Sequence, residues 1–209
     1  MLLVDVSASS LYSHTSVTKS EWMAEMAALL AFSAIKNNDK VGLLLFTDHV
    51  ELYIQPKKGL RHVLRVIREL LYFKPKHTGT DIRQALNFLG QVQKKRAICF
   101  IISDFLATPF ELEMKIAAKR HEMIAIQLYD SYERDFPSNG LIRLEDLETG
   151  EEILADSSAT SENYRRQGFD AARLLKQTVK KAGASLISIS TGESYSEALF
   201  RFFRQREKR

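Results

Sequence analysis

The chain has 209 residues, 45% of them hydrophobic and 27% charged, a composition that suits one folded domain and excludes a disordered or low-complexity chain. Its formal net charge of +4 arises in the last nine residues, which hold five cations and one anion, so residues 1–200 are neutral overall and we expect no nucleic-acid binding. No apolar run approaches the roughly 18 residues of a membrane span and the start has no signal-peptide pattern, so we expect no membrane span in this chain and a cytoplasmic location.

Apolar runs and helical periodicity alternate along the chain. We expect buried strands at residues 2–5, 41–46 and 97–102, further strands at 123–128 and 185–190, and helices at about 19–36, 60–73, 82–89, 110–119, 161–181 and 195–206. After a tight turn, residues 50–55 alternate apolar and polar side chains, which predicts an antiparallel edge strand with one face in solvent. Residues 141–145 and 152–155 flank a turn at 148–151, which predicts an inserted β-hairpin.

Strands that alternate with helices are typical of one fold class. We expect a single three-layer α/β domain over residues 1–209, with a doubly wound, mostly parallel sheet, helices on both faces and one antiparallel edge strand. The hairpin insertion covers about 141–155, and a basic helix covers about 195–209. The single cysteine, Cys99, lies in a buried strand run, so an internal disulfide is impossible and we expect a buried, unreactive thiol.

Polar side chains follow two of the predicted central strands, and another begins a helix. Asp5, Ser7 and Ser9 alternate at the end of the first strand, Thr80 enters a predicted helix, and Asp104 follows a later strand. In open α/β sheets the ligand crevice lies outside the carboxyl ends of the strands, so we expect these groups at one edge. Carboxylates and hydroxyls are hard oxygen donors. The sequence therefore predicts a site for Mg²⁺, Mn²⁺ or Ca²⁺ rather than for zinc.

Three short motifs occur in a fixed order: Asp-x-Ser-x-Ser at 5–9, Gly-Thr-Asp at 79–81 and Ser-Asp at 103–104. This order resembles the metal-ion-dependent adhesion site (MIDAS) of von Willebrand factor A domains. Residues 39–46, 101–105 and 146–150, with the Arg-rich end, are similar to an uncharacterised bacterial branch often encoded beside MoxR-type AAA+ ATPases. The resemblance covers the whole chain. It implies a von Willebrand A (Rossmann-like) fold, a bound divalent cation, and a role in protein assembly or ATPase partnership rather than catalysis.

The family pattern implies a role for each residue of the candidate site. Carried onto this sequence, it makes the hydroxyls of Ser7, Ser9 and Thr80 metal ligands, while Asp5 and Asp104 bind directly or through water. Two carboxylates balance a divalent ion, and one coordination position stays open for an Asp or Glu of a partner protein, such as a MoxR-type ATPase or its client. The predicted function is therefore that of a non-enzymatic, metal-dependent protein-binding module.

The loop that carries the candidate threonine holds other polar residues. Thr80 matches the family's spacing from threonine to helix better than Thr78 does. Asp81 is expected to be an N-terminal helix residue rather than a ligand. His77 and Lys76 are either solvated or form a basic rim that attracts an acidic partner.

Other interpretations stay open. The main alternative is a Mg²⁺-dependent phosphatase or phosphotransferase of haloacid dehalogenase type with Asp5 as nucleophile. That chemistry uses an Asp two residues later as general acid, and here that position is Ser7; no lysine is evidently placed to complete such a site either. A von Willebrand A scaffold with a vestigial site is a third interpretation. Family members usually carry a further region before the first strand, so Met1 is expected to be a boundary or a misplaced start.

Overall fold

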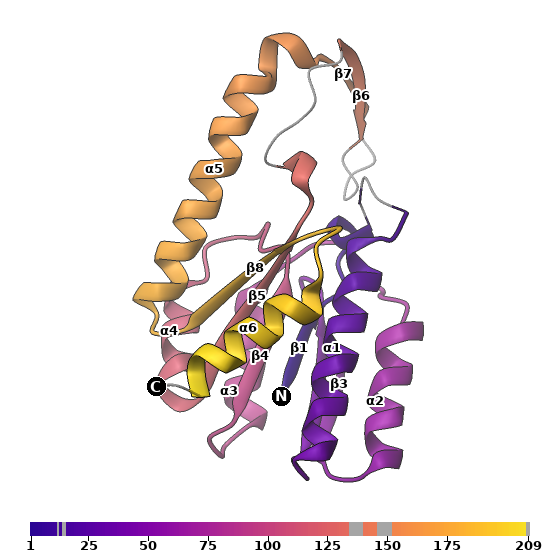
Figure 1. The fold of residues 1–209 in the computed structure, drawn as a ribbon, viewed down its shortest axis with the longest axis vertical. Helices are drawn as coiled ribbons and strands as arrows, with labels where there is room; N and C mark the ends of the chain where they lie inside the picture. The colour runs from indigo at the N-terminus through magenta and orange to yellow at the C-terminus, as the bar shows by residue number, and fades with distance from the viewer. Residues whose placement is uncertain (12, 14–15, 134–139, 146–151, 208–209) are drawn as a thin grey trace.

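A computed structural model describes the chain except for residues 12, 14–15, 134–139, 146–151 and 208–209 (Figure 1). Its main sheet has six strands in the order β3-β2-β1-β4-β5-β8. They are β1 (Leu2–Asp5), β2 (Val41–Phe46), β3 (Val50–Lys57), β4 (Ile98–Ser103), β5 (Glu122–Tyr129) and β8 (Ser185–Ser190). All neighbours in this sheet run parallel except β2 and β3, so the predicted fold class, with its one antiparallel edge strand, is confirmed.

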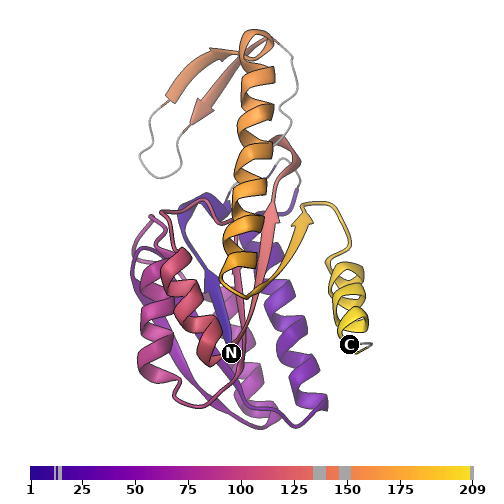
Figure 2. The same ribbon diagram turned by 90° about the vertical axis from the view of Figure 1, so that its left-hand side faces the viewer.

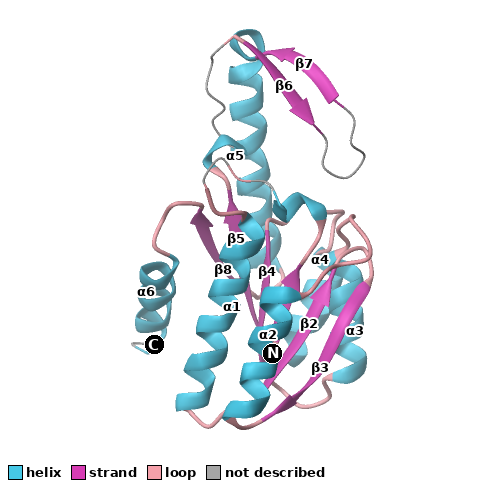
Figure 3. Cartoon of the chain, turned by 90° about the vertical axis from the view of Figure 1, so that its right-hand side faces the viewer, coloured by secondary structure: helices cyan, strands magenta, loops and turns pink. Residues whose placement is uncertain are grey.

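Helices cover both faces of this sheet (Figure 1, Figure 3). They are α1 (Lys19–Lys36), α2 (Leu60–Tyr72), α3 (Ile82–Val92), α4 (Glu111–Arg120), α5 (Ser157–Lys181) and α6 (Tyr195–Glu207). Residues of α1, α2 and α6 pack in one core with Leu2 and Val4, whereas residues of α3, α4 and α5 pack in a second core with Leu3. Because successive side chains of a strand point to opposite faces, the short run Leu2–Asp5 contributes to both cores.

The start of α1 shows how local sequence sets an element. The Glu21 backbone N–H donates to Thr18 Oγ1 at 3.2 Å, and the Thr18 N–H donates to Glu21 Oε2 at 2.8 Å. This capping box satisfies backbone donors that the first turn leaves free, so the helix begins at the predicted residue.

The inserted hairpin and helix α5 form an arm. Strands β6 (Leu141–Glu145) and β7 (Glu152–Asp156) pair antiparallel as a separate sheet; the turn predicted at 148–151 and the motif at 146–150 lie outside the described residues. Helix α5 begins at Ser157, four residues earlier than predicted. It rises beyond the ends of β5 and β8 with the hairpin at its far end (Figure 2). The arm therefore stands at the edge of the sheet where the candidate site residues were predicted.

Within the described part of the chain, the helices lack the combination of length and apolar composition that crossing a bilayer requires. The thiol of Cys99 is fully buried, as predicted, and burial raises its pKa to about 11. A thiol with this pKa stays protonated at neutral pH, so it is a weak nucleophile.

Candidate metal site

Asp5 is the last residue of β1, the strand between β2 and β4, and its side chain is buried. Its Oδ1 accepts a hydrogen bond from the Ser7 backbone N–H at 2.9 Å, and its Oδ2 accepts one from Ser103 Oγ at 2.6 Å. Each carboxylate oxygen thus has a protein donor. These donors hold the carboxylate in one orientation at the carboxyl end of the sheet.

Two serine hydroxyls lie side by side in the loop after β1. Ser7 Oγ and Ser9 Oγ are 3.1 Å apart, with Ser7 fully buried. A short 3₁₀ helix, η1 (Ala8–Leu11), follows β1. Ser10 closes this turn, since its Oγ donates to the Ser7 carbonyl at 2.6 Å. The turn leaves the Ser7 and Ser9 hydroxyl oxygens adjacent.

The loop before α3 lies against the loop after β1. The Ala8 N–H donates to the Thr78 carbonyl at 2.9 Å, and the Asp81 N–H donates to the Thr47 carbonyl at 3.1 Å. Between these two anchors, Thr80 Oγ1 is buried and has no hydrogen-bond partner among the described residues. A buried polar atom without a partner costs free energy, so the Thr80 hydroxyl oxygen is available to bind a metal ion.

Asp81 has the structural role that the sequence predicted. It is the N-cap of α3, and its Oδ1 accepts from the Arg83 N–H at 2.9 Å. Its Oδ2 also pairs with Arg83 Nη2 at 2.8 Å. These contacts hold the Asp81 carboxylate at the helix terminus.

Asp104 follows β4 and is also buried. Its Oδ1 accepts from the Leu106 N–H at 3.1 Å, and its Oδ2 accepts from Lys19 Nζ at 2.8 Å. The next residue, Phe105, has a positive φ of 61°. This left-handed conformation is uncommon outside glycine, and here it occurs where the chain turns away from the end of β4.

The two carboxylates lie close enough to influence each other. Burial, and next to it the negative charge of Asp104, raises the pKa of Asp5 from 3.8 to about 6, although hydrogen bonds from Ser103 and Ser7 act in the opposite direction. A cation between the carboxylates would remove this repulsion. The two carboxylates, the Thr80 hydroxyl and the serine pair offer only oxygen atoms as ligands, and oxygen is the ligand type that a hard divalent ion such as Mg²⁺ prefers.

This raised pKa predicts a pH-dependent stability in metal-free buffer. Between pH 3.8 and about 6 the folded chain keeps a proton on Asp5 that the unfolded chain has lost, so the contribution of Asp5 to stability falls as the pH rises through this window. Asparagine does not titrate, so Asp5→Asn lacks this loss. As the pH rises through the window, we expect the free energy of unfolding of Asp5→Asn to increase by at least about 1 kcal/mol relative to that of the original chain, since one pKa unit corresponds to roughly 1.4 kcal/mol. Urea unfolding of both chains at several pH values measures the difference. A difference in free energy of unfolding that stays constant with pH would contradict the raised pKa of Asp5.

Lys19 is a site residue that the sequence analysis missed. Its side chain is 1% exposed, and its Nζ lies 2.8 Å from Asp104 Oδ2 and 2.6 Å from Glu133 Oε1, in the 3₁₀ helix η2 (Ser131–Glu133). Burial alone would lower the pKa of Lys19, but the two carboxylates outweigh burial and raise it. From the sequence no lysine was evidently placed to complete a phosphatase-type site, whereas the structure places Lys19 against Asp104. One signal was available: Lys19 is the first residue of the helix that leaves the loop after β1, so it begins at the same sheet edge.

The predicted rim residues lie on the outer side of this edge. His77 and Lys76 are both exposed, and their backbone N–H groups donate to Glu51 Oε1 at 3.0 Å and 3.2 Å. The His77 ring stacks on the ring of His49, with centroids 4.1 Å apart. A role of these residues in attracting a partner stays a prediction.

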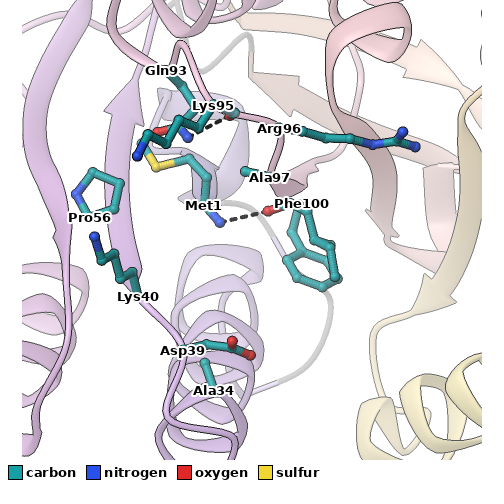
Figure 4. Close-up of a pocket in the computed structure, with 11 residues that line it drawn as sticks. Met1, Ala34, Asp39, Lys40, Pro56, Gln93, Lys95, Arg96, Ala97 and Phe100 are labelled. Atoms are coloured by element: carbon teal, nitrogen blue, oxygen red, sulfur yellow. Dashed lines mark hydrogen bonds between the residues drawn. The ribbon is translucent and has the colours of Figure 1, made fainter.

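A pocket of about 350 Å³ lies near the amino ends of the parallel strands (Figure 4). Met1, Lys40, Pro56 and Phe100 are among the residues that line it, and the Met1 amino group donates to the Ile98 carbonyl at 2.7 Å. The candidate metal ligands do not line this pocket, because they lie at the carboxyl ends of β1 and β4 or, in the case of Thr80, in the loop before α3.

Two curated relatives are uncharacterised mycobacterial proteins. Rv1480 of Mycobacterium tuberculosis is 24% identical over 212 residues, covering 99% of this chain and 67% of that protein. A protein of Mycobacterium avium is 26% identical over 131 residues, covering 61% of this chain and 77% of that protein. These relatives extend the similarity over nearly the whole chain without adding a known activity.

Two solved structures are similar in fold. An aerotolerance-related membrane protein from Bacteroides fragilis superposes with a TM-score of 0.65 at 16% identity, covering 96% of this chain and 95% of that chain. The conserved hypothetical protein BatB from Bacteroides thetaiotaomicron gives 0.56 at 17% identity, covering 87% and 97%. At these identities the likeness concerns the fold alone. The family described as "Protein of unknown function DUF58" matches residues 1–178, which is most of the 209 residues, so the chain belongs to the DUF58 family.

Proposed function

We propose that this chain is a non-enzymatic module that binds a divalent cation at a MIDAS-type site and uses that cation to capture an acidic side chain of a partner protein. The observation that carries this proposal is the Thr80 hydroxyl, which is buried without a hydrogen-bond partner in the described structure. It lies in a loop that is hydrogen-bonded to the loop of Ser7 and Ser9. The resemblance of the three motifs to von Willebrand A domains supports the same assignment.

The contacts divide the donors into two groups. Ser7, Ser9 and Thr80 would hold the ion directly through their hydroxyl oxygens. Asp5 and Asp104 already accept hydrogen bonds on both carboxylate oxygens, so they suit a role through bridging water. When bound, the ion would supply an open coordination position for an incoming carboxylate.

The charges near the site favour an acidic ligand. Glu133 forms an ion pair with Lys19, so these two charges cancel. The carboxylates of Asp5 and Asp104 then balance the two charges of the ion without an excess of negative charge. A partner carboxylate would therefore meet no net repulsion, and in the low-dielectric surroundings of these buried groups its attraction to the ion would be strong.

The resemblance makes a MoxR-type AAA+ ATPase, or its client, the first partner to test. We expect the purified ATPase to bind the immobilised chain in Mg²⁺, and to bind at least tenfold more weakly in EDTA or to Thr80→Val. Thr78→Val is the matched control, because Thr78 is exposed on the same loop and its backbone contact to Ala8 is kept. Equal binding with Mg²⁺ and with EDTA would contradict the mechanism.

The position of Lys19 gives the phosphatase alternative support that was not evident from the sequence, because this lysine contacts Asp104. Against this, Asp5 is buried and both of its carboxylate oxygens accept hydrogen bonds, which leaves a nucleophile little access to a phosphate ester. Hydrolysis of p-nitrophenyl phosphate with Mg²⁺ separates the two functions. Turnover by the original chain that disappears in Asp5→Asn would support the phosphatase function and contradict the binding proposal.

A further inference from the structure

A second cluster of metal-binding side chains lies outside the oxygen-only set. His49, in the turn between β2 and β3, stacks on His77, in the loop between α2 and α3, with a ring-centroid distance of 4.1 Å and an interplanar angle of 20°. Asp48 lies beside them. One ligand atom from each of these three residues lies within 4.8 Å of the other two. Segments 28 residues apart in sequence thus bring two imidazoles and a carboxylate together.

Each histidine has one ring nitrogen beside a carboxylate. His77 Nδ1 is 2.8 Å from Glu51 Oε1, and His49 Nδ1 is 3.0 Å from Asp48 Oδ1. At His77 the hydrogen bond to Glu51 favours the tautomer with its proton on Nδ1, which leaves the lone pair of Nε2 for a metal, whereas Asp48, beside His49, is itself a candidate ligand. Metal-binding histidines usually have this arrangement, because the carboxylate orients the ring and raises its basicity.

Glu51 forms this support before any ligand binds. Its side chain is 2% exposed, and its Oε1 also accepts from the backbone N–H groups of Lys76 and His77 and from Thr47 Oγ1 at 3.1 Å. Burial opposes the ionised form of Glu51, but these hydrogen bonds together outweigh burial and lower its pKa. The carboxylate therefore fixes the His77 loop against the turn that carries His49.

We propose that Asp48, His49 and His77 bind one Zn²⁺ ion, with Glu51 as a positioning residue. Imidazole nitrogen with a carboxylate suits zinc, whereas Mg²⁺ prefers oxygen ligands alone. Because each imidazole lone pair lies in its ring plane, the stacked rings of His49 and His77 would have to turn out of the stack to form zinc bonds of about 2.0–2.2 Å, and the side chains, 43–60% exposed, have room to do so. The remaining coordination positions would face solvent. This site shares no ligand with the oxygen-only set and is independent of the proposed function.

The test is calorimetric titration of Zn²⁺ into the whole chain in an excess of Mg²⁺, with Co²⁺ absorption as a spectroscopic probe of the ligands. We expect one Zn²⁺ per chain. His49→Gln and His77→Gln should each weaken binding at least tenfold, and Glu51→Gln should weaken it roughly 10–100-fold, as supporting residues do. Lys76→Gln and Thr80→Val should leave zinc binding unchanged, because neither removes a proposed ligand.

The variants also separate this site from the magnesium site. Thr80→Val should lose the response to Mg²⁺ and keep zinc, while His77→Gln should do the opposite. Absence of saturable zinc binding would overturn the proposal. So would zinc binding that is unaffected in both histidine variants, or that is lost only in Thr80→Val.

Discussion

Lys19→Met is expected to lower the free energy of unfolding by about 3–5 kcal/mol at neutral pH, the usual effect of removing one partner from a buried ion pair. The ammonium group of Lys19 contacts Asp104 and Glu133 and is 1% exposed. Methionine keeps most of the side-chain volume but leaves two carboxylates without their cation. Urea unfolding in metal-free buffer measures the loss.

The matched control for this variant is Lys36→Met, which removes an exposed lysine from the last residue of the same helix and should change stability little. Lys19→Met/Glu133→Gln should recover part of the loss, because one of the two unpaired charges is removed. Lys19→Met should also bind Mg²⁺ more tightly, since a cation adjacent to Asp104 is gone. Equal stability of Lys19→Met and Lys36→Met would show that the buried pair does not form.

Saturating Mg²⁺ or Mn²⁺ is expected to raise the thermal midpoint of the original chain by roughly 5–10 °C. A ligand at about 100 times its Kd stabilises the folded state by roughly 2.7 kcal/mol, and for a chain of this size each kcal/mol shifts the midpoint by about 2–4 °C. Asp5→Ala and Ser7→Ala/Ser9→Ala should lose this rise. Differential scanning calorimetry with and without metal measures it.

Thr80→Val gives the sharpest form of this experiment. In the metal-free chain the hydroxyl is buried and unpartnered, so valine, which has the same shape, should leave the midpoint unchanged or raise it. The response to metal should disappear in Thr80→Val and persist in Thr78→Val. A full metal response in Thr80→Val would exclude this hydroxyl as a ligand.

The elements of this fold were predictable where local signals agreed with packing. Helix α1 has the predicted bounds, and its start was predictable because the capping box of Thr18 and Glu21 determines it. Strand β8 likewise has the predicted bounds. The early start of α5 was not predictable, because residues 157–160 lack the apolar periodicity on which the prediction depends.

The site was predictable only in part. The rule that functional groups follow the carboxyl ends of parallel strands indicated Asp5 and Asp104, and the structure places both there in buried positions. Lys19 was missed, because a lysine at the start of a helix is usually solvated and nothing local distinguishes one that points inward. The stacking of His49 on His77 was missed for another reason: it depends on how two loops far apart in sequence meet.

If the proposed site captures a partner protein, the arm bears on the direction in which that partner is held. A single bond to a metal ion leaves the bound protein free to swivel about that bond. Among the described side chains of α5, Leu175 and Val179 in its last turns are buried in the core, while Phe169, nearer the hairpin, is 58% exposed. A helix of 25 residues is about 37 Å long, so a partner that touched both the cation and the arm would be held at two distant points. The arm would then fix the orientation of the captured protein relative to the sheet.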